Sequence, residues 1–311
     1  MLASLLHGAV RLASRRHGGS YGRIAPVPRL PERDSLACGA VTLSLLRYHG
    51  AGRPLVLLHG LNNNAWCWVR TAALLAGERP ILAVSLRGHG RSSAPAQGYA
   101  LTDTTADLRG LLDRLDAGSV DLAGHSWGGR VALHLAATAP ARVHALVLAD
   151  PVPPRGMNPL LRVPGLVDAA LAHERGPFAD RARFEAARAR VFHLRLGDPI
   201  DLLDWEEGFR EQPDGSFRHV LPESGYREIV DRALRVDLTP LLHGLRCPVL
   251  LLRPTLSVGF WPGEAGQLRR HVPRLAVHRI AGDHTFIPTN PVDTAAAMRL
   301  FLDAAAPPRH G

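Results

Sequence analysis

A serine in a tightly constrained setting is the first residue of this chain that could do chemistry. It lies in the run Gly124-His125-Ser126-Trp127-Gly128, between an apolar segment that predicts a strand and a segment that predicts a helix. Glycines two residues before and after a serine permit a sharp strand-to-helix turn without Cβ clashes. Such a turn lifts the hydroxyl above the strand end, beside the free N–H groups of the helix. The motif therefore predicts Ser126 as a nucleophile that attacks a carbonyl carbon.

A serine hydroxyl needs a base, and histidine suits this task because its pKa lies near neutrality. The chain has 16 histidines, so position in the sequence must decide between them. His284 follows the last predicted strand and precedes the last predicted helix. His271 and His278 fall at a helix end and within a strand, and His125 is expected to point away from the serine as a packing residue. The sequence therefore predicts His284 as the base.

Acyl transfer also needs two hydrogen-bond donors directed at the oxygen on which negative charge develops. The backbone N–H of Trp127, directly after the serine, is predicted to be one of them. The other should come from the loop after the apolar run Leu55–Leu58, where the N–H of Leu61 is the candidate. Asn62 and Asn63 come next, followed by a third asparagine. These amides either bind substrate or satisfy a turn, and the sequence favours neither reading.

Apolar runs alternate with helix-like segments through much of the chain. Continuous apolar runs of about four to eight residues are typical of strands buried on both faces of a parallel sheet. Strands are predicted over residues 40–48, 54–58, 80–86, 120–123, 143–149, 247–253 and 276–281. Helices are predicted over residues 66–75, 102–115 (with Thr102 or Asp103 as the cap), 130–139 and 292–303. This alternation predicts an α/β fold with a doubly wound, mostly parallel sheet.

The alternation stops after Asp150, and this defines the predicted domains. Residues 151–244 are rich in arginine, begin with several prolines and show no strand-like run. We therefore expect a helical cap over 151–244, inserted into a sheet domain made of residues 40–150 and 245–311. Residues 1–39 are expected to form an N-terminal arm.

Several segments of the chain resemble those of an α/β-hydrolase of the capped esterase, lactonase and C–C hydrolase kind. They are Leu57–Leu61, Leu86–Ser92, the serine turn at 124–128 and Leu146–Asp150, and the region from Cys247 to Leu302 is similar as well. Together these stretches span well over half of the chain. The resemblance implies a catalytic triad in the order serine, acid, histidine. The cap does not resemble any family member in particular.

Two positions depart from the family pattern. Ser85 stands where the strand before Arg87 usually ends in an aspartate, and the loop at 254–259, which usually carries the triad acid, has no carboxylate. Asp150, at the end of the strand after the serine helix, is the preferred substitute. Glu264 is the next candidate, and a dyad without any carboxylate is the third. An unpartnered imidazolium would lose about 10⁴ in rate by serine-protease precedent.

Composition excludes several classes of protein. The net charge is +9, and all 37 basic residues are arginine, which resembles a codon bias more than a binding patch. The arginines form no dense block with interleaved aromatics, so nucleic-acid binding is not expected. The three cysteines, widely spaced, predict neither a disulfide framework nor a metal site, and they fit a reducing, cytoplasmic compartment. No cofactor is expected.

The first residues of the chain leave a second question open. Five arginines precede the first acid, Glu32, and an amphipathic helix that contacts a membrane surface is an alternative to a simple arm. A simple arm is the preferred interpretation, because chain ends are often poorly ordered. No apolar run reaches the ~18 residues of a membrane span.

Three functions remain open at this point. The preferred one is a serine hydrolase that cleaves a carboxylic ester or lactone of a small molecule through an acyl-enzyme. The second is a C–C bond hydrolase or a biosynthetic tailoring enzyme, such as a cyclase or acyltransferase, on the same residues. The third is an inactive hydrolase fold that acts as a binding module, since a fold alone does not fix function. The sequence does not predict the oligomeric state.

Overall fold

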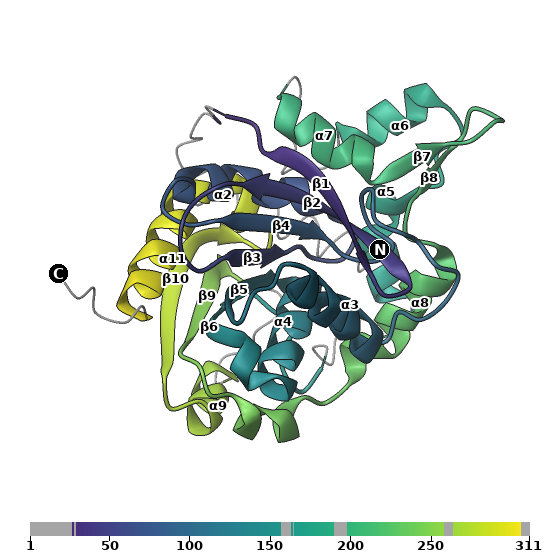
Figure 1. Cartoon of the computed structure of the whole chain (residues 1–311). Helices are drawn as coiled ribbons and strands as arrows, with labels where there is room; N and C mark the ends of the chain where they lie inside the picture. The colour runs from purple at the N-terminus through teal and green to yellow at the C-terminus, as the bar shows by residue number, and fades with distance from the viewer. Residues whose placement is uncertain are drawn as a thin grey trace.

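One eight-stranded sheet forms the centre of the protein (Figure 1). The structure is a computed structural model that describes residues 27, 29–156, 163, 165–189, 198–257 and 264–305. In spatial order the strands are β1 (Glu32–Cys38), β2 (Val41–Tyr48), β4 (Ile81–Ser85), β3 (Leu55–Leu58), β5 (Val120–His125), β6 (Val143–Ala149), β9 (Val249–Leu256) and β10 (Leu275–Asp283). The strands from β4 to β10 are parallel, while β2 runs antiparallel to β4 and β1 antiparallel to β2. The expected α/β fold with a mostly parallel sheet is confirmed.

Helices cover both faces of the sheet, as parallel strands require. On one face lie η1 (Ala65–Trp68), α2 (Val69–Leu75) and α11 (Pro291–Ala305), and on the other α3 (Leu101–Arg114), α4 (Ser126–Thr138) and α9 (Glu264–His271). Four short segments connect these larger elements: η2 (Pro140–Arg142), η4 (Ala233–Arg235), η5 (Thr239–Gly244) and α10 (Phe286–Thr289). This arrangement leaves the carboxyl ends of the parallel strands as the edge at which a site can form.

A group of elements between β6 and β9 gathers at one end of the sheet (Figure 1). Its members are α5 (Leu166–Arg175), α6 (Arg181–Arg188), α7 (Pro199–Glu207), β7 (Phe209–Glu211), β8 (Phe217–His219) and α8 (Glu223–Asp231). We call this group the cap. The cap has a small aromatic core of its own, in which the rings of Phe184 and Phe217 stack with centroids 4.4 Å apart. The domain boundaries drawn from the sequence stay a prediction.

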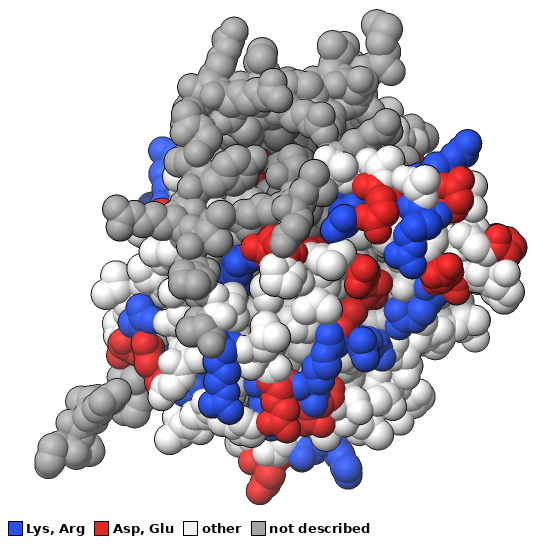
Figure 2. Space-filling model, turned by 90° about the horizontal axis from the view of Figure 1, so that it is seen from above, with Lys and Arg blue, Asp and Glu red and all other residues white. Residues whose placement is uncertain are grey.

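Charged side chains of both signs lie side by side on the face shown in Figure 2. Pairing of opposite charges also occurs on the cap, where Arg227 lies 2.8 Å from both Glu223 and Asp168. Exposed pairs of this kind contribute little to stability, but they break up the single-sign field that a nucleic-acid surface needs. Among the described residues, no helix is long and apolar enough to span a bilayer. The expectations about partners and compartment stay predictions.

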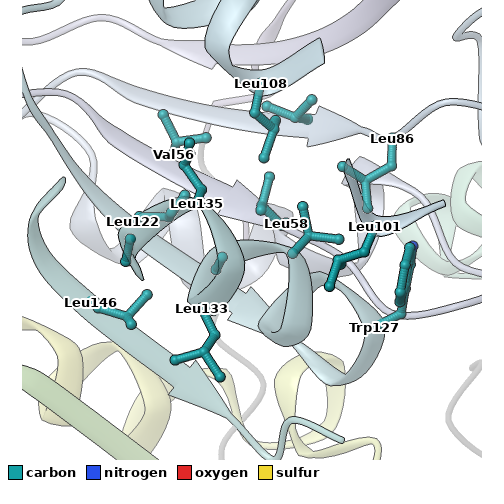
Figure 3. Close-up of a cluster of buried hydrophobic side chains, with 14 of the residues drawn as sticks. Val56, Leu58, Leu86, Leu101, Leu108, Leu122, Trp127, Leu133, Leu135 and Leu146 are labelled. Atoms are coloured by element: carbon teal, nitrogen blue, oxygen red, sulfur yellow. The ribbon is translucent and has the colours of Figure 1, made fainter. Parts of the chain in front are cut away.

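The hydrophobic core forms two layers because successive strand residues point to opposite faces. In β3, Val56 and Leu58 pack under α3 and α4, whereas Leu55 and Leu57 pack under α2 and α11. Figure 3 shows the first layer, where Val56, Leu58 and Leu122 meet the helix residues Leu108 and Leu135. Every residue of β5 is buried. The strand that ends at the serine is thus fixed by packing on both sides.

Three expectations about elements were wrong in detail. The predicted arm contributes β1 to the sheet, where every residue of the strand from Glu32 to Cys38 pairs with a residue of β2. The predicted all-helical cap contains the hairpin β7–β8, whose aromatic residues pack on the cap core. The cap of α3 is Ala100, whose N–H donates to the Asp103 side chain at 3.0 Å, so neither Thr102 nor Asp103 is the N-cap residue.

Truncation of a buried residue in β5 should reveal how much the central layer contributes to stability. Leu122 is 1% exposed, so Leu122→Ala leaves a cavity and should lower the free energy of unfolding by about 2–5 kcal/mol. Urea denaturation followed by circular dichroism measures this change. Leu300→Ala, at a residue 74% exposed, is the matched control and should change it by less than about 0.5 kcal/mol. Equal losses in the two variants would contradict the layered core.

Candidate active site

The serine lies on a strained turn between β5 and α4. Ser126 has φ of +51°, in the left-handed region that side chains rarely adopt. A Cβ on Gly124 would lie 2.2 Å from the carbonyl oxygen of Gly128, and one on Gly128 would lie 2.5 Å from the carbonyl oxygen of His59. Both glycines are therefore needed, because the chain crosses itself closely at this turn.

Among the non-glycine residues, positive φ angles concentrate at this edge of the sheet. Four non-glycine residues of the described chain have them, and three, Asn62, Ser126 and Asp150, follow the ends of the strands β3, β5 and β6. The fourth, Asp116, lies in the turn after α3. Such strain persists only where the surroundings over-determine it, and it is common at functional sites.

The structure brings the three predicted catalytic residues into hydrogen-bond contact. Nε2 of His284 lies 3.0 Å from Oγ of Ser126, and Nδ1 of His284 lies 2.7 Å from Oδ2 of Asp150. Because the carboxylate only accepts, the ring carries its hydrogen on Nδ1 and offers the Nε2 lone pair to the serine hydroxyl. A base between a nucleophile and an orienting acid is the arrangement that serine catalysis requires.

Asp150 supplies the carboxylate that the sequence pattern lacked. It is completely buried, and its Oδ1 accepts a hydrogen bond of 2.5 Å from the hydroxyl of Ser257. Residues 254–256 continue β9, so Ser257 begins the loop in which the family usually places its acid. A serine there leaves room for the carboxylate from β6 and donates to it. The alternative acid, Glu264, begins α9, and its side chain lies outside the described residues.

Electrostatics favour the charged form of the histidine. Burial lowers the pKa of His284, but the hydrogen bond and the charge of Asp150 raise it, and Asp283 and Glu174 add to the rise. The balance is a pKa above the ordinary 6.5. Glu174, at the end of α5, is itself shifted, because burial raises the pKa of its carboxyl to about 7. The cap thus brings a second titratable carboxyl within range of the histidine.

His125 does not point away from the site, contrary to the expectation. Its ring lies 4.7 Å from the ring of His284 and tilts 41° to it. Nε2 of His125 donates to the carbonyl oxygen of His284 at 2.8 Å, which holds the backbone of the loop after β10. The sequence carried no local signal for this contact, because His125 and His284 lie 159 positions apart.

The loop after β3 passes close to the serine, as the predicted oxyanion hole requires. A Cβ on Gly60 would lie 2.9 Å from Nδ1 of His125 and 3.2 Å from Cβ of Ser126, so a larger residue there would have to displace these side chains. His59 fixes the loop, because its Nδ1–H donates to the carbonyl of Gly60 at 2.7 Å and its Nε2 accepts from the N–H of Leu86 at 2.9 Å. The roles of Leu61 and of the Trp127 N–H, in the first turn of α4, stay predictions.

The three asparagines of this loop have different environments. Asn64 caps η1, since its Oδ1 accepts from the N–H of Trp66 at 3.0 Å and its Nδ2 donates to the carbonyl of Asp204 at 2.7 Å. The N–H of Asn63 closes the turn onto the carbonyl of Gly60 at 3.2 Å. Asn62 instead contacts the cap through its side chain. The substrate-binding roles of Asn62 and Asn63 stay predictions.

Gly124, in the sharp turn before Ser126, offers a test of the local geometry. Gly124→Ala should lower the free energy of unfolding by about 1–3 kcal/mol, because its Cβ meets the backbone of Gly128, which cannot yield cheaply. Chemical denaturation measures the loss. Gly118→Ala, where a Cβ meets nothing within 4 Å, is the control and should be neutral or slightly stabilising. An undiminished stability of Gly124→Ala would show that the turn is looser than described.

Comparison with known proteins agrees with this architecture. The alpha/beta hydrolase fold family model matches residues 53–303. A 2-(acetamidomethylene)succinate hydrolase of Mesorhizobium japonicum is 30% identical over 268 residues, covering 86% of this chain and 93% of that protein. A fluoroacetate dehalogenase of a Burkholderia species is 29% identical, covering 88% and 94%. The crystal structure of an E-2-(acetamidomethylene)succinate hydrolase superposes with a TM-score of 0.77 at 25% identity, covering 88% of this chain and 99% of that one. The chain belongs to the alpha/beta hydrolase fold family.

Proposed function

We propose that this protein is a serine hydrolase that cleaves a carboxylic ester or lactone of a small molecule through an acyl-enzyme. The hydrogen-bonded chain from Ser126 through His284 to Asp150 carries the proposal. A hydroxyl activated by a neutral imidazole attacks carbonyl carbon, and the relatives named above are hydrolytic enzymes whose substrates differ. Their diversity supports hydrolysis more than it supports any one bond.

The proposed reaction moves one proton back and forth along the site. As Oγ of Ser126 bonds to the carbonyl carbon, its proton passes to Nε2 of His284, and the charge on the carbonyl oxygen faces the N–H groups of Leu61 and Trp127. The imidazolium, stabilised by Asp150, then protonates the leaving oxygen. Water, deprotonated by the same nitrogen, attacks the acyl group and releases Ser126. These steps use only side chains and amides of this chain.

Covalent labelling tests the nucleophile. A fluorophosphonate probe should label the wild type and fail to label Ser126→Ala, because only an activated serine oxygen attacks its phosphorus. Ser224→Ala, an exposed serine that bonds the carbonyl of Ala96, is the matched control and should still be labelled. Intact-mass spectrometry reads the adduct.

Turnover separates the candidate functions. Hydrolysis of short p-nitrophenyl esters by the untreated wild type, which the probe labels in a separate sample, supports the esterase proposal. Labelling without any ester turnover would instead favour C–C cleavage or a tailoring reaction on the same residues. An absence of labelling at every pH would favour an inactive binding module.

The pH profile tests the role of Asp150. The base must be neutral, so kcat/KM should rise with pH through the pKa of His284, with a midpoint above 6.5 in the wild type. Asp150→Asn removes the charge that stabilises the imidazolium, so the midpoint should move to lower pH and the plateau should fall by about 10⁴. Asp303→Asn, whose side chain is 57% exposed, is the control and should leave both unchanged. An unaltered profile in Asp150→Asn would transfer the role to another acid.

A further inference from the structure

An arginine of the cap holds the loop that follows β3. Arg175, the last residue of α5, donates from Nη1 to Oδ1 of Asn62 at 3.2 Å. Asn62 directly follows Leu61, whose N–H is a proposed oxyanion donor. The contact therefore joins the cap to the part of the core where the reacting carbonyl would lie.

This hydrogen bond fixes which way the amide of Asn62 faces. Because Oδ1 accepts from a guanidinium, the oxygen and nitrogen of the amide cannot exchange places without setting two donors against each other. Nδ2 of Asn62 is consequently presented on the other side, where it is buried and has no partner among the described residues. Buried donors in native structures are nearly always satisfied, so an orphan donor in the loop that passes close to Ser126 at Gly60 points to an absent ligand.

Arg175 is well held for this purpose. Its guanidinium lies 3.8 Å from the ring centroid of Tyr226, and Nη2 donates to Oε2 of Glu223 at 3.1 Å. Its side chain is only 11% exposed. Stacking and an ion pair together immobilise the planar fork, which is the property that distinguishes arginine from lysine.

A second residue of the cap holds the backbone of Asn62. Nε2 of His219 lies 3.4 Å from the carbonyl oxygen of Asn62, and its Nδ1 accepts from the N–H of Leu221 at 3.0 Å, so the ring donates to the loop. Burial lowers the pKa of His219 to about 3, which keeps this ring neutral. The positive φ of Asn62 is therefore stabilised from the cap at both its amide and its carbonyl.

We propose that Arg175 is a positioning residue that directs Nδ2 of Asn62 at a hydrogen-bond acceptor on the substrate. The acceptor is an oxygen of the acyl group close to the scissile carbonyl, so the preferred substrates are oxygen-bearing esters such as alkoxy, keto or hydroxy acyl esters. This inference rests on the proposed hydrolase function. A site built around an amide donor discriminates against a substrate that leaves the donor unpaired.

Matched esters in which one CH₂ is replaced by oxygen test this preference. The pairs are p-nitrophenyl methoxyacetate with butyrate, and p-nitrophenyl 3-methoxypropionate with valerate, each rate being divided by the hydroxide-catalysed rate of the same ester. In the wild type, kcat/KM for at least one oxygen ester should exceed that of its partner by roughly threefold to tenfold, the worth of one hydrogen bond. Asn62→Ala should abolish that preference and bring the ratio of the two kcat/KM values to one.

Variants of the arginine test the positioning role. Arg175→Met removes the donors and should reduce the ratio toward one, because the loss of rate is larger for the oxygen ester than for its hydrocarbon partner. Arg175→Lys should restore part of the ratio. In the double variant with Asn62→Ala, Arg175→Met should cause no further loss of the ratio, since both changes remove one interaction. Arg227→Met is the control, because Arg227 also contacts Glu223 and lies over Tyr226 but does not bond Asn62.

The outcomes separate this inference from the proposed function. Equal rate losses for both members of a pair in Arg175→Met, or a loss as large in Arg227→Met, would reduce Arg175 to a structural role and overturn the inference. A wild type without any preference for the oxygen esters would overturn it as well. All these variants should still react with the fluorophosphonate probe, and failure of the wild type to do so would refute the hydrolase proposal itself.

Discussion

The hydrogen bond between His284 and Asp150 joins residues 134 positions apart, and the rest of the site depends on it. A carboxylate with no exposed surface is costly unless it is paired, and here an imidazole N–H and the hydroxyl of Ser257 satisfy its two oxygens. The same bond selects the tautomer of the ring and raises its pKa, so the nitrogen facing Ser126 is a basic lone pair. This one contact thus fixes the orientation of the His284 ring and the nitrogen that carries its hydrogen, and it stabilises the charged form of the ring.

The parallel sheet makes this contact possible at low entropic cost. Strands β5 and β6 pair directly, β6 pairs with β9, and β9 with β10, so the segments carrying Ser126, Asp150, Ser257 and His284 leave the sheet at neighbouring positions. Both faces of β5 and β6 and most of β9 are buried, which removes the freedom of these three strands to shift register. The strained φ angles at Ser126 and Asp150 are tolerated because this packing over-determines the backbone. Rigidity of the core is therefore part of the chemistry.

Much of this arrangement was predictable because local patterns specify it. The turn glycines, the apolar runs and the late position of His284 each follow from short-range rules, and Asp150 followed from the absence of any other carboxylate in the expected loop. The hairpin β7–β8, the role of Ser257 and the contact of Arg175 with Asn62 did not. The hairpin is local, but its strands have only 3 residues each, too few for a strand pattern to stand out. The other two contacts depend on the meeting of segments far apart in the chain, such as 175 with 62, and no local pattern marks such partners.

The cap explains why the substrate is harder to derive than the reaction. The core residues that would make and break bonds are held by the sheet, but the residues that would choose the substrate are held by cap elements, through side-chain contacts alone. Arg175 of α5 and His219 of β8 both contact Asn62 in the loop after β3. Glu174 of α5 adds a titratable carboxyl near His284. A change at Arg175 or His219 would alter the contacts of Asn62 without removing any contact of the triad residues. Relatives with the same core can therefore act on different molecules. In this chain, the few cap residues that contact the core are the ones that would determine the choice of substrate.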